Sequence, residues 1–193
     1  MSCPLRVDSE FDLKRRVYDS LMAQSKGHRN DEVLAQILAS WVGGNSILPQ
    51  WLGLEEGDFF ALYSFHFRQA PLYLPAFKPS LHVEKRPEQD DLLVLLMEHR
   101  AGRYIGELWL ADILVASCMG SDHLWEDLGV WSRPQLTTLL QRNFPSLANK
   151  NTDDMKWKKF LYKQLCEQYS SYVCRAPSCE SCVDYGNCFG PED

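Results

Sequence analysis

The sequence lacks long apolar runs, a surplus of positive charge and a leader-like N-terminus. No segment of the 193 residues approaches the ~18 consecutive apolar residues of a membrane span. The net charge of -6 disfavours nucleic acid and anionic membranes as partners, because both attract an excess of lysine and arginine. The stretch from Met1 to Asp8 becomes charged too early for a signal peptide. We therefore expect a cytoplasmic protein that binds neither nucleic acid nor membrane.

The common catalytic motifs are also missing. The chain contains no Walker-type phosphate-binding loop, no G-x-S-x-G, no H-E-x-x-H and no glycine-rich dinucleotide fingerprint. Carboxylates are numerous, with 26 Asp and Glu, but no pair is distinguished from ordinary surface charge. These absences predict that the protein is not an enzyme.

Strand-like alternation is absent as well, and apolar residues instead recur at helical spacing. The pattern predicts an all-α fold, a compact helical bundle whose helices cover approximately 9–24, 30–42, 54–67, 90–100, 105–118, 132–143 and 151–169. Residues 68–88 carry four prolines, which predicts an extended surface connector. We divide the chain into a helical domain, 1–170, and an irregular C-terminal cysteine-rich tail, 171–193.

Three of these helices are expected to be largely buried. The helix over 54–67 should bury its aromatic and apolar side chains, which are Phe59, Phe60, Leu62, Tyr63 and Phe67. The helix over 90–100 is nearly all apolar after Asp90 and Asp91, which predicts a position in the centre of the domain. The helix over 105–118 is expected to be a second central helix.

Cysteine is concentrated in the tail. Of the seven cysteines, four follow the spacing C-x4-C-x2-C-x5-C, and these are Cys174, Cys179, Cys182 and Cys188. Thiolates are soft ligands, and four of them close together favour zinc, copper(I) or an iron–sulfur cluster. Pro177 and Gly186 between them favour turns over helix or strand. In the reducing cytosol such a cluster is expected to bind metal rather than to form disulfides.

The spacing of the four loop cysteines is compatible with two kinds of metal centre. A zinc ribbon has two C-x2-C knuckles separated by roughly 12–20 residues. This loop has one C-x2-C, and all four cysteines lie within fifteen residues. Gaps of four and five residues suit an iron–sulfur cluster, which spreads its ligands around a larger core than a zinc ion does. The cluster is our preferred interpretation, and a structural zinc site with four cysteine ligands is the alternative.

Further residues near the loop are secondary candidates. Cys166 is expected about two helical turns before the loop, and Cys118 lies earlier in the chain. Either could act as an additional or exchange ligand, or could be a small core residue. A positive patch is also predicted beside the loop, and its members are Lys156, Lys158, Lys159, Lys163 and Arg175. Such a patch would attract an oxyanion or offset the charge of a cluster, although the solvated face of an amphipathic helix has the same pattern.

The loop and three upstream segments resemble the NifQ family of nitrogen-fixation proteins. The segments are Cys174-x4-Cys179-x2-Cys182-x5-Cys188-Phe-Gly, His123-Leu-Trp-Glu-Asp-Leu-Gly, Phe144-Pro-Ser-Leu-Ala and Asn151-Thr-x-x-Met155-Lys-Trp-Lys-Lys-Phe-Leu-Tyr-Lys-Gln-Leu-Cys166. The resemblance covers residues 118–190 well, and the cysteine pattern shows no departure from the family. It adds His123 to the secondary metal candidates, since imidazole can bind metal or orient a neighbouring group.

The resemblance implies a molybdenum carrier for iron–molybdenum cofactor assembly. Such proteins hold a molybdenum–iron–sulfur cluster and pass molybdenum to the nitrogenase iron protein and the NifEN scaffold, with molybdate and sulfide as sources. Because a carrier must release its metal, we expect a Mo-3Fe-4S type of cluster in which three thiolates hold iron and molybdenum has a labile ligand. Two other functions fit the residues: a helical interaction or regulatory protein with a zinc tail, and a small electron carrier with a 4Fe-4S cluster.

Overall fold

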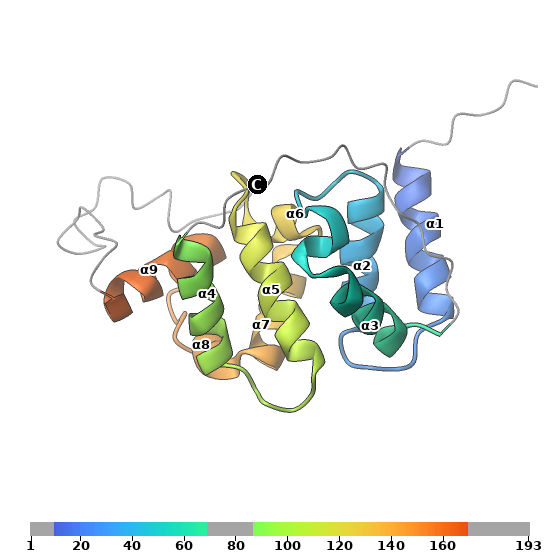
Figure 1. Cartoon of the computed structure of the whole chain (residues 1–193). Coiled ribbons are helices and arrows are strands. Elements are labelled where there is room, and N and C mark those ends of the chain that lie inside the picture. Colours follow the sequence, from blue (N-terminus) through green and yellow to red (C-terminus); the bar gives the residue numbers. More distant parts are fainter. Residues whose placement is uncertain (1–9, 69–86, 170–193) are drawn as a thin grey trace, which may run out of the picture.

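The computed structural model describes residues 10–68 and 87–169 (Figure 1). Within these ranges the helices are α1 (Glu10–Ala23), α2 (Asp31–Val42), α3 (Glu56–His66), α4 (Pro87–Glu98), α5 (Gly106–Cys118), α6 (Leu124–Leu128), α7 (Arg133–Asn143), α8 (Pro145–Ala148) and α9 (Trp157–Tyr169), with a 3-10 turn, η1 (Gln50–Gly53), before α3. Strand pairing in the same ranges is limited to one antiparallel bridge, Ser25 to Phe67. The all-α prediction is therefore confirmed for this part of the chain. The tail and nearly all of the predicted connector lie outside it.

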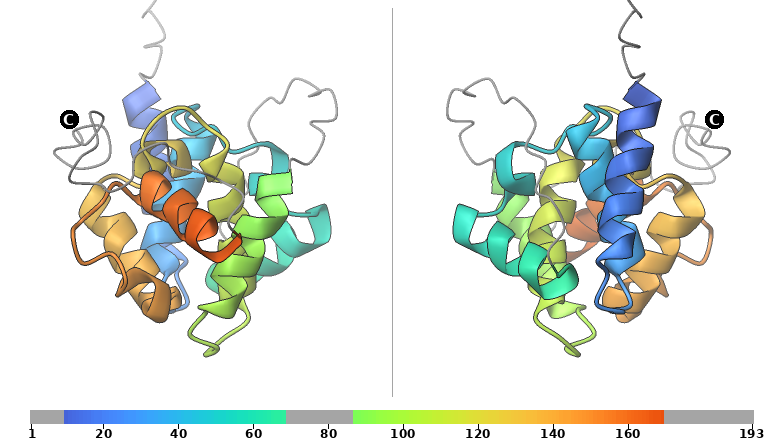
Figure 2. Two further views of the ribbon diagram at one scale, coloured as in Figure 1. Left: turned by 90° about the vertical axis from the view of Figure 1, so that its left-hand side faces the viewer. Right: turned by 90° about the vertical axis from the view of Figure 1, so that its right-hand side faces the viewer.

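The helix α5 lies in the middle of the described structure. Figure 1 shows α4 and α9 on one side of α5 and α1, α2 and α3 on the other, and the views in Figure 2 place α9 and α1 at opposite ends. A single apolar core connects these helices, and its buried members include Leu34 and Ile37 of α2, Leu110 and Leu114 of α5 and Leu161 of α9. No helix among the described residues has both the length and the apolar character needed to cross a bilayer.

Several helix boundaries follow from local signals and are confirmed. α7 begins directly after Ser132, carries Pro134 in its first turn and ends before Phe144. Proline is tolerated there because the N–H that it lacks would have no partner within the helix. α2 ends at Val42, directly before the glycine pair Gly43-Gly44, as expected of residues that favour the end of a helix.

Three details differ from the prediction. Phe60 is 40% exposed and Val94 is 44% exposed, so α3 and α4 each place one large apolar side chain at the surface instead of burying all of them. α4 begins at Pro87, inside the predicted connector, because proline fits the first turn of a helix. α9 begins at Trp157 rather than near residue 151, because side-chain bonds described below hold the preceding residues in a turn.

Candidate functional site

The predicted metal ligands lie outside the described residues. This applies to Cys174, Cys179, Cys182 and Cys188 of the loop and to Arg175 of the predicted patch. The structure instead describes the elements that precede the loop, of which α9 is the last. Within residues 10–68 and 87–169, no group of three or more His, Cys, Asp and Glu side chains is placed so that it could hold a metal ion.

Side-chain hydrogen bonds fix the segment that leads into α9. Asn151 Oδ1 accepts a bond from the backbone N–H of Met155 at 2.8 Å, and Asn151 Nδ2 donates to the Met155 carbonyl at 2.9 Å. Arg133 of α7 donates to the carboxylate and to the carbonyl of Asp154, both at 2.9 Å. Asp154 has a φ of 51°, in the left-handed region that aspartate tolerates better than most residues. These bonds close a turn, and the helix starts only after it.

A buried ion pair joins α9 to α6. Lys158 Nζ contacts Asp127 Oδ2 and donates to the carbonyl of Gly120 at 2.9 Å. The Asp127 side chain is 1% exposed and the Lys158 side chain is 14% exposed. A Cβ at Gly120 would lie 2.3 Å from Asp127 Oδ2, so any larger residue there would displace the carboxylate. The pair connects two segments that carry the family resemblance, 123–129 and 151–166.

Cys118 is buried beside this ion pair and is 4% exposed. Burial raises the pKa of its thiol to about 12, with Asp127 adding to the shift and Lys158 opposing it. A thiol with that pKa is protonated at neutral pH, whereas a metal ligand is a thiolate. The environment of Cys118 therefore favours a small apolar core residue over a metal ligand.

Cys166 and His123 lie closer to the surface, and both are partly buried. Cys166 belongs to the second half of α9, eight residues before Cys174. His123 directly precedes α6, where its backbone N–H donates to Glu126 Oε2 at 3.1 Å. Cys118 forms no disulfide with another of the described residues. Metal ligation by Cys166 or His123 stays a prediction.

The lysines of the predicted patch occupy different environments. Lys158 is turned toward Asp127, and Lys163 Nζ lies 3.9 Å from Glu167 Oε1 one helical turn away. Lys159 is exposed and Lys156 is partly buried. The charge of two of the four lysines is thus matched by a carboxylate within the helical domain, and attraction of an oxyanion by the patch stays a prediction.

A buried histidine–carboxylate pair was missed by the sequence analysis, which assigned no role to His66. His66 Nδ1 lies 2.6 Å from Asp31 Oδ1, and the two side chains are 0% and 3% exposed. Asp31 Oδ2 also accepts bonds from the N–H groups of Gly27 and His28, at 2.8 and 3.0 Å, and contacts the hydroxyl of Ser25. The pair therefore ties the α1–α2 loop to the end of α3. No local signal connects two residues that are 35 positions apart.

The surroundings of the pair lower both pKa values. Burial lowers the pKa of His66, although Asp31 acts in the opposite direction, and His66 Nε2 is buried without a hydrogen-bond partner among the described residues. Burial favours a higher pKa for Asp31, but the hydrogen bonds from Ser25, His66 and His28 outweigh it, and the pKa lies below its usual range. At neutral pH the pair is a carboxylate that accepts a bond from a neutral imidazole.

The pair predicts a loss of stability on acidification. The contribution of His66 to the free energy of unfolding is fully present above its ordinary pKa of about 6.5. It is lost as the pH falls from that value through the lower pKa of the folded state, because the unfolded chain binds the proton first. One such group gives a slope of at most about 1.4 kcal/mol per pH unit. Urea denaturation at pH 7.5 and 5.5 should show a larger loss in the original protein than in His66→Gln. Equal losses in the two proteins would contradict this assignment. The Asp31 contribution should be lost separately, below about pH 4.

Comparisons with known proteins identify one family. A family model described as NifQ matches residues 33–190, a span that contains all four loop cysteines. The chain is 43% identical over 185 residues to "Protein NifQ" of Azotobacter vinelandii, which covers 90% of this chain and 95% of that protein. It is 39% identical over 162 residues to "Protein NifQ" of Rhodobacter capsulatus, with 83% and 87% covered. No solved structure matches the chain.

Proposed function

This chain belongs to the NifQ family of nitrogen-fixation proteins, and on that basis we propose that it carries molybdenum into iron–molybdenum cofactor assembly. The observation that supports this proposal most strongly is the C-x4-C-x2-C-x5-C loop, because it lies within the span that matches the family. Four soft thiolates at this spacing suit an iron–sulfur core, which is the kind of cargo that can include molybdenum.

The proposed role is binding and release rather than catalysis. The cargo is a Mo-3Fe-4S type of cluster, in which three of the loop thiolates hold iron and molybdenum keeps one replaceable ligand. A replaceable ligand lets molybdenum leave for the nitrogenase iron protein and the NifEN scaffold, while molybdate and sulfide supply the carrier. These partners place the protein in the cytoplasm. Cys166 is the described residue best placed along the chain to serve as an exchange ligand, since it lies eight residues before the loop.

The described helices support this role by holding the element that precedes the cargo site. The turn at Asn151 and the ion pair between Lys158 and Asp127 attach the start of α9 to α6 and α7. A binding site is more selective when rigid elements support its first ligands. The family resemblance in segments 123–129 and 151–166 thus falls on residues that anchor α9.

Replacing single loop cysteines tests the proposal. Cys174→Ser, Cys179→Ser, Cys182→Ser and Cys188→Ser each exchange a soft thiolate for a harder hydroxyl ligand, so each variant is expected to lose most of its bound iron and molybdenum. Metal content per folded protein is measured after anaerobic purification. Cys3→Ser is the matched control, because Cys3 lies far outside the motif, and it should keep both metals. Retention of both metals in all four loop variants would refute the proposal.

A further inference from the structure

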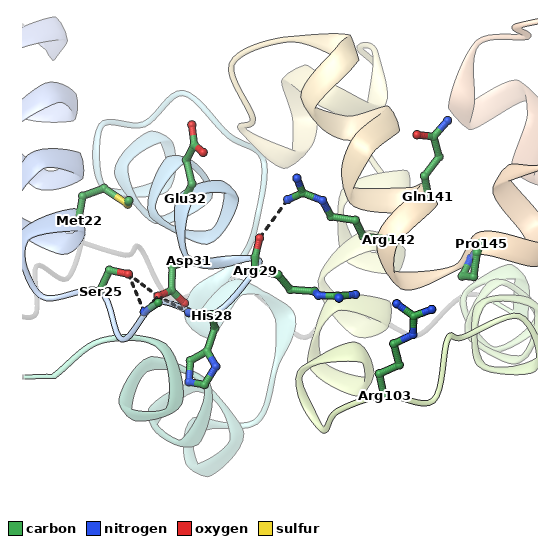
Figure 3. A pocket seen from close by; sticks show the side chains of 11 residues that line it. Met22, Ser25, His28, Arg29, Asp31, Glu32, Arg103, Gln141, Arg142 and Pro145 are labelled. Carbon is green, nitrogen blue, oxygen red and sulfur yellow. Dashed lines mark hydrogen bonds between the residues drawn. The ribbon is translucent and has the colours of Figure 1, made fainter.

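Three arginines border one cavity of about 690 Å³ at the surface of the helical domain (Figure 3). Arg29 comes from the α1–α2 loop, Arg103 from the loop before α5, and Arg142 from the end of α7. Figure 3 shows Arg29 and Arg103 extending toward one another, with Arg142 directed at the Arg29 backbone. The Arg142 Nη1 atom donates to the Arg29 carbonyl at 3.0 Å.

The positive charges of these arginines are only partly offset by the carboxylates of the cavity wall. None of the three guanidinium groups forms an ion pair with a carboxylate among the residues described. Asp31 and Glu32 also line the cavity, but the Asp31 carboxylate already accepts bonds from His66 and from two backbone N–H groups. Three arginines against two carboxylates leave the wall with one net positive charge, in a protein whose net charge is -6.

A buried hydrogen-bond network fixes the backbone segments that carry the three arginines, whose side chains are exposed. Its centre is Asn143, which is 0% exposed and whose Oδ1 accepts bonds from Asn30 Nδ2 and from the Tyr104 hydroxyl, both at 2.9 Å. Each of these three residues is the direct neighbour in sequence of one cavity arginine. Burial raises the pKa of Tyr104, so its hydroxyl stays protonated and acts as the donor. The network therefore fixes three distant chain segments at one place.

The loop that carries Arg103 has an additional anchor. The Glu107 carboxylate, which is 0% exposed, accepts bonds from the N–H groups of Gly102 and Arg103 at 2.6 and 2.9 Å. The backbone N–H of Ala101 donates to the carbonyl of Asn143 at 2.8 Å. These bonds fix the backbone of the segments from which the exposed arginine side chains extend into the cavity.

We propose that this cavity binds a doubly charged tetrahedral oxyanion through Arg29, Arg103 and Arg142. Guanidinium groups suit this ligand because each presents parallel N–H donors that bind two oxygens at once, and because they stay charged at any physiological pH. The choice of molybdate as the ion rests on the proposed function, which requires molybdate as the source of molybdenum. The cavity would then hold the oxyanion at a site separate from the cysteine loop.

Calorimetric titration of the full chain with sodium molybdate at constant ionic strength tests this proposal. Arg29→Gln and Arg103→Gln should each weaken molybdate binding about tenfold or more, as expected for losing hydrogen bonds to a charged group. Arg15→Gln is the matched control, because Arg15 is an exposed arginine that pairs with Asp19 on α1, and it should bind like the original protein. Sulfate, which has the same shape and charge, should compete, and planar monovalent nitrate should not.

Several results would overturn the proposal. These are undetectable molybdate binding, equal affinity in the arginine variants, equal competition by nitrate, or a loss that instead follows Lys156→Gln, directly before α9, and Lys159→Gln on α9. A variant with all four loop cysteines replaced by serine distinguishes the oxyanion site from the proposed carrier function, because this variant should keep molybdate binding in the cavity. If that variant binds molybdate while the original protein never acquires a molybdenum-containing cluster, the oxyanion site stands and the proposed carrier function fails.

Discussion

Lys158→Met is expected to destabilise the fold by about 3 kcal/mol, because it leaves the Asp127 carboxylate buried without its cation. Breaking a buried ion pair costs about 3–5 kcal/mol, and the low end applies here because Lys158 is still 14% exposed. Methionine keeps the apolar stem of lysine and most of its length, so the lost charge is the main change. The free energy of unfolding from urea denaturation at pH 7.5 measures the effect.

Two further variants isolate the ion pair. Lys159→Met makes the same substitution at the neighbouring exposed position and should change stability by less than about 0.5 kcal/mol. Lys158→Met combined with Asp127→Leu removes both charges and should recover part of the loss, because no buried charge is left unpaired. If Lys158→Met were no more damaging than Lys159→Met, the pair would not hold α9 in place.

Asn143→Leu is expected to destabilise the fold by about 3 kcal/mol and to weaken the oxyanion site. The substitution leaves the Asn30 amide and the Tyr104 hydroxyl without their shared acceptor, and each unsatisfied buried polar group costs about 1–3 kcal/mol. It also frees the three segments that carry the cavity arginines. Urea denaturation measures the first effect, and molybdate titration of the folded variant measures the second.

Asn149→Leu serves as the control for this prediction, since it makes the same change at an exposed position outside the network. It should leave both stability and molybdate affinity close to those of the original protein. An Asn143→Leu protein that binds molybdate as tightly as the control does would show that the network does not organise the arginines.

Helix positions were predictable where the signal is local. α7 follows from Ser132 and Pro134 at its start and from Phe144-Pro145 after its end, all of which act within one turn. The start of α9 was predicted six residues too early, because Arg133 of another helix holds the intervening turn closed. Asn30, the first residue of the helix predicted over 30–42, stands at the N-cap of α2, yet its side chain bonds to Asn143 instead of capping the helix.

The candidate sites likewise differ in whether a short-range sequence pattern or tertiary packing defines them. The cysteine motif is a short-range pattern, so four metal ligands could be proposed from the sequence and the resemblance could be recognised from it. The cavity arginines are isolated residues in three separate segments, and no periodicity or spacing relates Arg29 to Arg103 or Arg142. Tertiary packing brings them together through the buried Asn143 network, and the His66–Asp31 pair depends on packing in the same manner.

Metal analysis of protein purified without oxygen, from cells supplied with molybdate and sulfide, tests the central claim most directly. The proposed carrier function predicts a brown protein that contains both iron and molybdenum, and whose colour is lost when the loop cysteines are replaced. A brown protein with iron but no molybdenum would indicate an electron carrier instead. A colourless protein with one zinc ion per chain would indicate a structural zinc tail, and either of these two results would contradict the claim.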